Sequence, residues 1–172
     1  FDTNQLLQRA KSEEEILSQT ASQLMKLLNR SLIVYPEQNG DLGSEQFFGV
    51  DGETAQNIFS APEERDAANW TFANKKRSGA GTDSYPDAKG LYLALRTGGG
   101  VFGVIGIDLS EKPLDAFENS VLLSILGEGA LAIENRRNAL EKEQATVQAK
   151  NEELRANLLR TISHDLRTPL TS

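Results

Sequence analysis

The sequence predicts an α+β domain, an antiparallel sheet flanked by helices, followed by a long C-terminal helix. Short apolar segments lie between helical patterns, which favours strands that pair in one antiparallel sheet. Apolar and polar residues alternate on both sides of the glycine run 98–100, which is typical of a β-hairpin. From Pro113 onward the pattern is helical, with no glycine after Gly129.

The N-terminal part is expected to contain one helix and one strand. Ser12 and Glu15 fit a capping box, so the first helix is predicted to begin at Ser12. Residues 4–10 form either an earlier helix or a leading arm. The apolar segment 32–35 predicts a buried strand that ends at Pro36.

A second strand and a second helix are expected next. Residues 45–50 predict the strand. Ser60 and Glu63 fit another capping box, with a proline close to the first helical position, so a helix is predicted from there to about Lys76. The glycine-, aspartate- and proline-rich segment 78–90 is expected to be a loop. The helix is predicted to turn these side chains inward: Ala67, Trp70 and either Phe72 or Ala73.

The hairpin strands are predicted at 91–96 and 101–109, and the long helix opens at Pro113 and Asp115. Its early part is broadly apolar, and its later part is charged. A stripe with seven-residue spacing persists through the later part, which favours a coiled coil with a second copy. The other seam carries polar residues, so a solvated single helix remains the alternative. The stripe contains Ile133, Leu140, Val147 and Leu154, and the other seam contains Arg137, Gln144 and Asn151.

These patterns divide the chain into three expected parts. We expect residues 1–133 to form the α+β domain, 134–157 a helical linker, and 158–172 the start of a further helical domain. The helical pattern is unbroken from Asp115 to Asp165, which favours a rigid connector. The chain begins without Met and ends abruptly at Ser172, so it is expected to be an excised piece whose parent could contain membrane segments.

The amino-acid composition excludes several classes of function. The net charge is −7 and there is no basic cluster, which argues against nucleic-acid binding. The absence of cysteine excludes disulfides, thiolate catalysis and cysteine-based metal sites. A single histidine excludes a metal site with several imidazole ligands. No apolar run approaches the roughly 20 residues that span a bilayer, and no metal site is expected.

That histidine, His164, lies in a helical segment with an apolar stripe. Leu159, Ile162 and Leu166 are three and four residues apart and share one face. His164 is two residues from both Ile162 and Leu166, a rotation of about 200°, so its ring is predicted to point toward solvent. A neutral imidazole is a nucleophile near neutral pH and can attack a phosphoryl group.

Neighbouring residues fit the same chemistry. A carboxylate at Asp165 could accept the imidazole N–H and raise the basicity of the attacking nitrogen. Thr168 is four residues after His164 and is expected on the same face, where its hydroxyl could hold a water. Pro169 is expected to bend the helix. An ordinary surface histidine is the alternative.

The segment 163–170 resembles the H-box of sensor histidine kinases. The resemblance implies that His164 is autophosphorylated from ATP and hands the phosphoryl group to a response regulator, with Asp165 as the assisting acid. Thr168 matches the position linked to dephosphorylation of the regulator. ATP and Mg²⁺ are expected for the full-length kinase, bound by its own ATP-binding domain. The chain stops before any such region, so by itself it should be inactive and hold no cofactor.

Residues 12–134 resemble a GAF domain in pattern. The runs 70–73, 79–86 and 91–93 resemble the GAF region of the KdpD family, with Ser84 and Tyr85 in place of an expected Thr-Leu. The KdpD resemblance implies an inner-membrane sensor kinase that controls potassium uptake, with this region on the cytoplasmic side and acting as a homodimer.

The GAF resemblance also raises the question of a ligand. The loop 79–83 could bind a small anion through backbone N–H groups, with Thr82 or Asp83 touching the ligand. A plain structural loop, in which glycines permit positive φ, is the alternative. A ligand-binding or dimerisation module without a catalytic role is therefore the competing functional interpretation.

Overall fold

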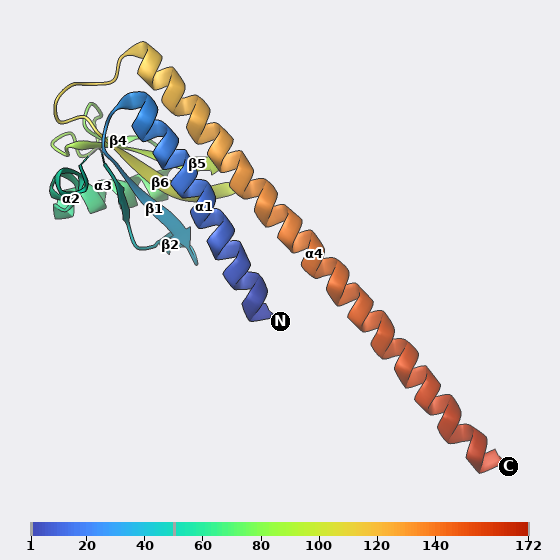
Figure 1. Ribbon diagram of the computed structural model, residues 1–172. Helices are drawn as coiled ribbons and strands as arrows, with labels where there is room; N and C mark the ends of the chain where they lie inside the picture. Colours follow the sequence, from blue (N-terminus) through green and yellow to red (C-terminus); the bar gives the residue numbers. More distant parts are fainter. Residues whose placement is uncertain (1, 50, 172) are drawn as a thin grey trace. The chain divides into compact units, whose positions relative to one another are not determined.

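The computed structural model describes the backbone of residues 2–49 and 51–171 and the side chains of 13–165, apart from positions 50 and 52. Within these residues, six strands form one antiparallel sheet in the order β2-β1-β6-β5-β4, and β3 also pairs with β1 (Figure 1). The strands are β1 Leu32–Gln38, β2 Asp41–Leu42, β3 Gln46–Phe48, β4 Ser78–Gly79, β5 Gly90–Thr97 and β6 Gly100–Asp108.

Helices cover both faces of the sheet. The helices are α1 Asp2–Leu28, α2 Gly52–Phe59, α3 Pro62–Asn74 and α4 Ala116–Thr171. α1 and the first part of α4 pack on one face, and α2 and α3 pack on the other. The chain divides into two compact units, residues 1–136 and 137–172. The predicted α+β class is confirmed.

The hairpin confirms the alternation in the sequence. β5 and β6 pair along their whole length, from Gly90 opposite Asp108 to Thr97 opposite Gly100. Leu91, Leu93 and Leu95 face α1 and α4, whereas Tyr92 faces α3. β5 therefore takes part in both cores, because successive side chains of a strand point to opposite faces.

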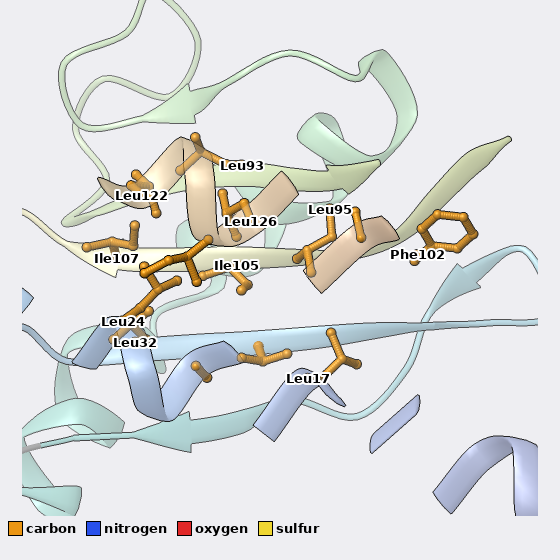
Figure 2. Packing of buried hydrophobic residues seen from close by; sticks show 14 of the residues in the cluster. Leu17, Leu24, Leu32, Leu93, Leu95, Phe102, Ile105, Ile107, Leu122 and Leu126 are labelled. Carbon is orange, nitrogen blue, oxygen red and sulfur yellow. The ribbon is translucent and has the colours of Figure 1, made fainter. Parts of the chain in front are cut away.

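The larger core lies between the sheet and the two long helices. Figure 2 shows Leu17 and Leu24 of α1 and Leu122 and Leu126 of α4 meeting side chains from β1, β5 and β6. Leu24 and Leu122 are fully buried. Each buried leucine of this kind contributes about 1.5–3 kcal/mol, so the core fixes this part of α4 against the sheet.

Two features near the N-terminus differ from the predictions made from the sequence. α1 begins at Asp2, ten residues before Ser12, and residues 2–28 form one helix. Strand β1 continues through Pro36 to Gln38. The carbonyl of Pro36 accepts the N–H of Gly43 at 2.7 Å, on the side where β1 no longer pairs with β3, so the missing proline N–H breaks no sheet hydrogen bond.

The segment between β3 and α3 was also predicted incompletely. Helix α2 was not predicted. Its N-cap is Asp51, whose carboxylate accepts the N–H of Glu53 at 3.2 Å. Ser60 is the C-cap of α2, and the N-cap of α3 is Ala61, which makes no side-chain capping bond. The capping box predicted at Ser60 is therefore wrong, although Pro62 does open the helix.

The inward face of α3 differs from the prediction. Its buried residues are Glu64, Ala67, Ala68 and Thr71. Ala67 was predicted correctly, whereas Trp70 and Phe72 are only half-buried and Ala73 is exposed. Small side chains on the inner face let α3 approach the strands closely.

Helix α4 begins one residue after Asp115, close to its predicted start. Asp115 and Glu118 exchange hydrogen bonds, each side chain accepting the backbone N–H of the other, at 2.7 and 3.2 Å, which is a capping arrangement. Contrary to the sequence expectation, α4 is long and apolar enough by length and composition to cross a membrane, a test that a core helix also passes.

Candidate functional site

The segment that carries His164 is helical and exposed. His164 and Asp165 lie in α4, and both are exposed. Leu159 and Ile162 are 59 % and 45 % exposed. The imidazole therefore lies on a helix surface that a separate domain can approach, as phosphoryl transfer between domains requires.

The structure describes the side chain of Asp165, but only the backbone at Thr168 and Pro169. Adjacent positions on a helix are about 100° apart, so Asp165 follows His164 in the chain but projects from a neighbouring face of the helix. The backbone of α4 continues past Thr168 and Pro169 to Thr171, but the side chains beyond Asp165 lie outside the described residues. The catalytic roles of these residues stay predictions.

A buried carboxylate lies on the face of the sheet that α2 and α3 cover, and the sequence analysis missed it. Glu64 of α3 is 2 % exposed. Its Oε1 accepts the N–H of Gly90 at 2.9 Å and the hydroxyl of Tyr92 at 2.8 Å, and its Oε2 accepts the N–H of Lys89 at 3.0 Å. These three donors offset the cost of burying the group and tie α3 to the start of β5.

The two tyrosines of this face are held in their neutral form. Burial raises the pKa of Tyr92 far above its usual value, and the Glu64 carboxylate raises it further. Burial also raises the pKa of Tyr35, and Glu45 adds to that effect. The two phenol rings fill the space between the sheet and α3, together with Phe59.

One open pocket of about 430 Å³ lies at the edge of this cluster. Its apolar walls include Tyr35, Phe47 and Phe59. The guanidinium of Arg65 lies over the Tyr35 ring, 5.2 Å from its centroid, and donates to Glu45 at 3.0 Å. An aromatic wall beside an arginine is a general binding surface for planar or anionic groups.

The loop that contains the predicted ligand residues is held by its own hydrogen bonds. The hydroxyl of Thr82 lies 2.9 Å from the carbonyl of Gly79 and 2.8 Å from that of Ser84. Gly79 has a positive φ of 96°, which favours glycine. Asp83 is exposed. These contacts give Thr82 a structural role, and ligand binding by Thr82 and Asp83 stays a prediction.

A cluster of hydrogen bonds around Arg30 holds the beginning of α4. The guanidinium donates to the carbonyls of Asp108, Lys112 and Pro113 at 3.0, 2.7 and 3.0 Å. Its Nε also donates to the Glu118 carboxylate at 3.1 Å. The hydrogen bond from Arg30 lowers the pKa of Glu118. Arg30 follows α1 directly, so it joins the end of one long helix to the start of the other.

A second contact holds α4 sixteen residues further on. The hydroxyl of Thr97, at the end of β5, donates to the carboxylate of Glu134. The same hydroxyl accepts the N–H of Gly99 in the hairpin turn at 3.0 Å. Among the side chains that the structure describes, no group of three metal-binding residues lies together.

Comparisons with known proteins agree with this geometry. No family model matches the sequence. The sensor protein KdpD of Clostridium acetobutylicum is 35 % identical over 157 residues, which is 91 % of this chain and 17 % of that protein. The sensor protein KdpD of Escherichia coli is 31 % identical over 144 residues, 83 % of this chain and 15 % of that protein.

The fold is shared with solved GAF domains. The PixJ GAF domain of Thermosynechococcus elongatus matches with a TM-score of 0.54 and 17 % identity, covering 83 % of this chain and 96 % of that one. The fold and the relatives together define the class of protein, a sensor protein with a GAF-type domain and a long C-terminal helix. The chain is homologous to the KdpD sensor proteins. It spans about a sixth of the length of these relatives.

Proposed function

We propose that this chain is the sensory and phosphoacceptor portion of a sensor histidine kinase of the KdpD family. The homology to KdpD over 91 % of the chain carries the proposal. The exposed His164 on α4, the single histidine of the sequence, gives the chemistry a specific acceptor.

The reaction uses the neutral imidazole as a nucleophile. A ring nitrogen of His164 attacks the γ-phosphorus of ATP, the N–P bond forms, and the P–O bond to ADP breaks. Asp165 holds or receives the proton of the other ring nitrogen. ATP and Mg²⁺ are bound by a separate ATP-binding domain of the full-length kinase.

The phosphoryl group then passes to an aspartate of a response-regulator receiver domain, and the imidazole is restored. Thr168 places a water for a separate reaction, in which the aspartyl phosphate of the regulator is hydrolysed and inorganic phosphate is released. The homology to the KdpD sensor proteins supports a role in potassium sensing, so we assign this protein to control of potassium uptake. We place the chain on the cytoplasmic side of the membrane protein to which it belongs.

The active protein is proposed to be a homodimer. Val147 is half-buried and Leu154 is 66 % exposed, and both lie on the predicted stripe. A second copy of α4 would cover these side chains along a parallel seam. This arrangement also presents His164 of one chain to the ATP-binding domain of either chain.

Phosphoryl transfer to the chain tests the proposal. The chain is incubated with radiolabelled ATP, Mg²⁺ and the isolated ATP-binding domain of its parent kinase. We expect an acid-labile, base-stable phosphate on the wild type that is absent from His164→Ala. Ser163→Ala is the matched control, because Ser163 is the adjacent exposed residue, and it should be labelled normally. Equal labelling of the wild type and His164→Ala would refute the assignment of His164 as the phosphate acceptor.

The pocket beside Tyr35 supports a second candidate, a GAF module that binds a small ligand or only dimerises. A ligand that binds the folded state raises the melting temperature by mass action. A reproducible shift with one metabolite, abolished in Arg65→Ala, would favour ligand binding. If no compound gives a shift and the chain is dimeric without label on His164, dimerisation alone is the better assignment.

A further inference from the structure

Strand β5 connects the two layers of the sensory domain. Its start is bound by the buried Glu64 of α3, through the N–H of Gly90 and the hydroxyl of Tyr92. Its end is bound to α4, through the hydroxyl of Thr97 and the carboxylate of Glu134. A shift of β5 along its length therefore acts at once on α3 and on α4.

The two contacts that hold α4 differ in strength. At the start of the helix, Arg30 makes five charge-assisted bonds, three to backbone carbonyls and two to Glu118. Arg30 is 7 % exposed, so water competes little for these bonds. At Glu134 the helix has one side-chain hydrogen bond, which is only partly buried.

The position of the weaker contact also matters. Glu134 lies two residues before Arg136, the last residue of the first unit, and α4 continues from there into the unit that carries His164. Between the two contacts, the inner face of α4 is packed on the sheet by Leu122, Leu126 and Ile133. Thr97 and Glu134 therefore form a late polar contact between the sheet and α4 before the helix enters the second unit.

The hairpin turn is shaped for this contact. A side chain at Gly99 would run into the end of the Glu134 side chain, so a glycine at this position allows the turn to approach α4. The N–H of Gly99 donates to the Thr97 hydroxyl, which orients that hydroxyl so that its own proton points to Glu134.

We propose that the Thr97–Glu134 hydrogen bond is a releasable latch on α4, whose opening frees the helix from Glu134 onward while the Arg30 cluster and the core residues up to Ile133 keep its beginning in place. The proposal rests on the proposed function, because the latch acts on phosphorylation of His164 through α4. Thr97 and Glu134 are positioning residues that touch neither substrate nor phosphate. A single hydrogen bond shifts a two-state equilibrium by roughly two- to tenfold, a suitable size for a signal-dependent switch.

The test uses the full-length kinase with Thr97→Val, which keeps the shape of the side chain and removes the donor. Thr97→Ser keeps the hydroxyl and should restore the wild-type behaviour. Thr54→Val is the matched control, because it removes a hydroxyl bond to Asp51 at 2.9 Å at the start of α2 and leaves the Thr97–Glu134 contact unchanged. Amide hydrogen exchange and the rate of His164 phosphorylation are measured for each variant.

We expect Thr97→Val to raise the exchange rate of α4 amides near Glu134 by roughly two- to tenfold, with no change near Glu118. The phosphorylation rate of His164 should change by a similar factor and return to the wild-type value in Thr97→Ser. Unchanged exchange near Glu134 would show that the bond does not hold the helix. Faster exchange with an unchanged phosphorylation rate would show a structural contact without a regulatory role.

These failures are distinct from failure of the proposed function. If the wild-type kinase carries no phosphate on His164, the proposed function fails, and the latch fails with it as a control of that reaction. The hydrogen-exchange comparison still decides whether Thr97 holds α4.

Discussion

Replacement of Arg30 by alanine should strongly destabilise the sensory domain. The variant removes the donor from three carbonyls and leaves the carboxylate of Glu118, whose side chain is only 14 % exposed, without its cation. Breaking one side of a buried ion pair costs about 3–5 kcal/mol. We expect a loss of this size, because the Arg30 guanidinium is buried and joins the end of α1 to the loop before α4 and to Glu118.

The loss translates into a large change in melting temperature. The entropy of unfolding is about 2.1 cal/mol/K per residue, which gives about 0.29 kcal/mol/K for the 136 residues of the first unit. The expected drop is therefore about 10–17 °C, measured by circular dichroism. Arg30→Lys should fall between the wild type and Arg30→Ala, because an ammonium cannot reproduce the planar set of donors.

The pH dependence provides an independent check. The Arg30 hydrogen bond lowers the pKa of Glu118 in the folded state. This contribution to stability is present above the unfolded pKa, about 4.3, and is lost as pH falls through the lower folded value. Arg30→Ala should lack this component of acid destabilisation, as should Glu118→Gln. A drop of less than about 3 °C for Arg30→Ala, roughly 1 kcal/mol, would refute the reasoning.

Two further predictions concern glycines and tyrosines. Gly129→Ala should lower the free energy of unfolding by about 1–3 kcal/mol, because the new Cβ would lie 2.8 Å from Oγ1 of Thr20. Gly127→Ala should raise the free energy of unfolding by about 0.5–1 kcal/mol, since nothing lies within 4 Å of its Cβ position. Thermal unfolding measures both, and equal effects would contradict the packing described. Burial raises the pKa of Tyr35 and Tyr92 in the folded state. Their contribution to the free energy of unfolding is therefore complete below the unfolded pKa, about 10, and decreases as the pH rises above it. An absorbance titration should show these two ionising only as the protein unfolds; reversible ionisation of all tyrosines in the folded protein would contradict this.

Local patterns in the sequence were sufficient for the elements with strong periodicity. The hairpin was predicted from alternation on both sides of the glycine run 98–100, and it exists as β5 and β6. The long helix was predicted from its caps and apolar spacing, and α4 begins within one residue of Asp115. The first part of α4 packs one face on the core, so its helical period is visible in the sequence, whereas β5 and β6 are buried on both faces and were indicated by apolar runs on either side of a glycine turn.

Elements with weaker local signals were placed less well. Ser12 and Glu15 matched a capping box, but both lie inside α1, because serine and glutamate are also tolerated within a helix. Ser60 matched the same pattern, yet the chain uses it to end α2. Capping residues are common on surfaces, so the pattern alone does not decide between the start, the interior and the end of a helix.

In the candidate site, too, residues with a local sequence signal were predicted, and residues whose partners are distant in sequence were not. His164 was located from a short run of residues, and its exposure follows from its place on the helix. Glu64 and Arg30 were not singled out, because their partners lie 25 to 88 residues away in sequence. An acid in the first turn of a helix and an arginine after a helix are ordinary surface positions in a sequence. The proline that follows Ala61 was the available hint that Glu64 lies in a first turn, and nothing local showed its burial.

The second unit exposes more apolar surface than a solvated helix should. Leu154, Leu158, Leu159 and Ile162 are 45–66 % exposed. Leu154 lies on the predicted stripe, and Leu158 lies seven residues after Asn151 of the other seam, so a parallel partner helix would cover both. Leu159 and Ile162 lie outside that seam, on the apolar stripe that projects from another face of the helix than His164. We therefore expect dimerisation to cover the first pair, and the second pair to stay available for another domain of the kinase. Leu154→Asp should weaken self-association, whereas Leu159→Asp should leave it intact and slow phosphorylation, which sedimentation and the labelling assay can separate.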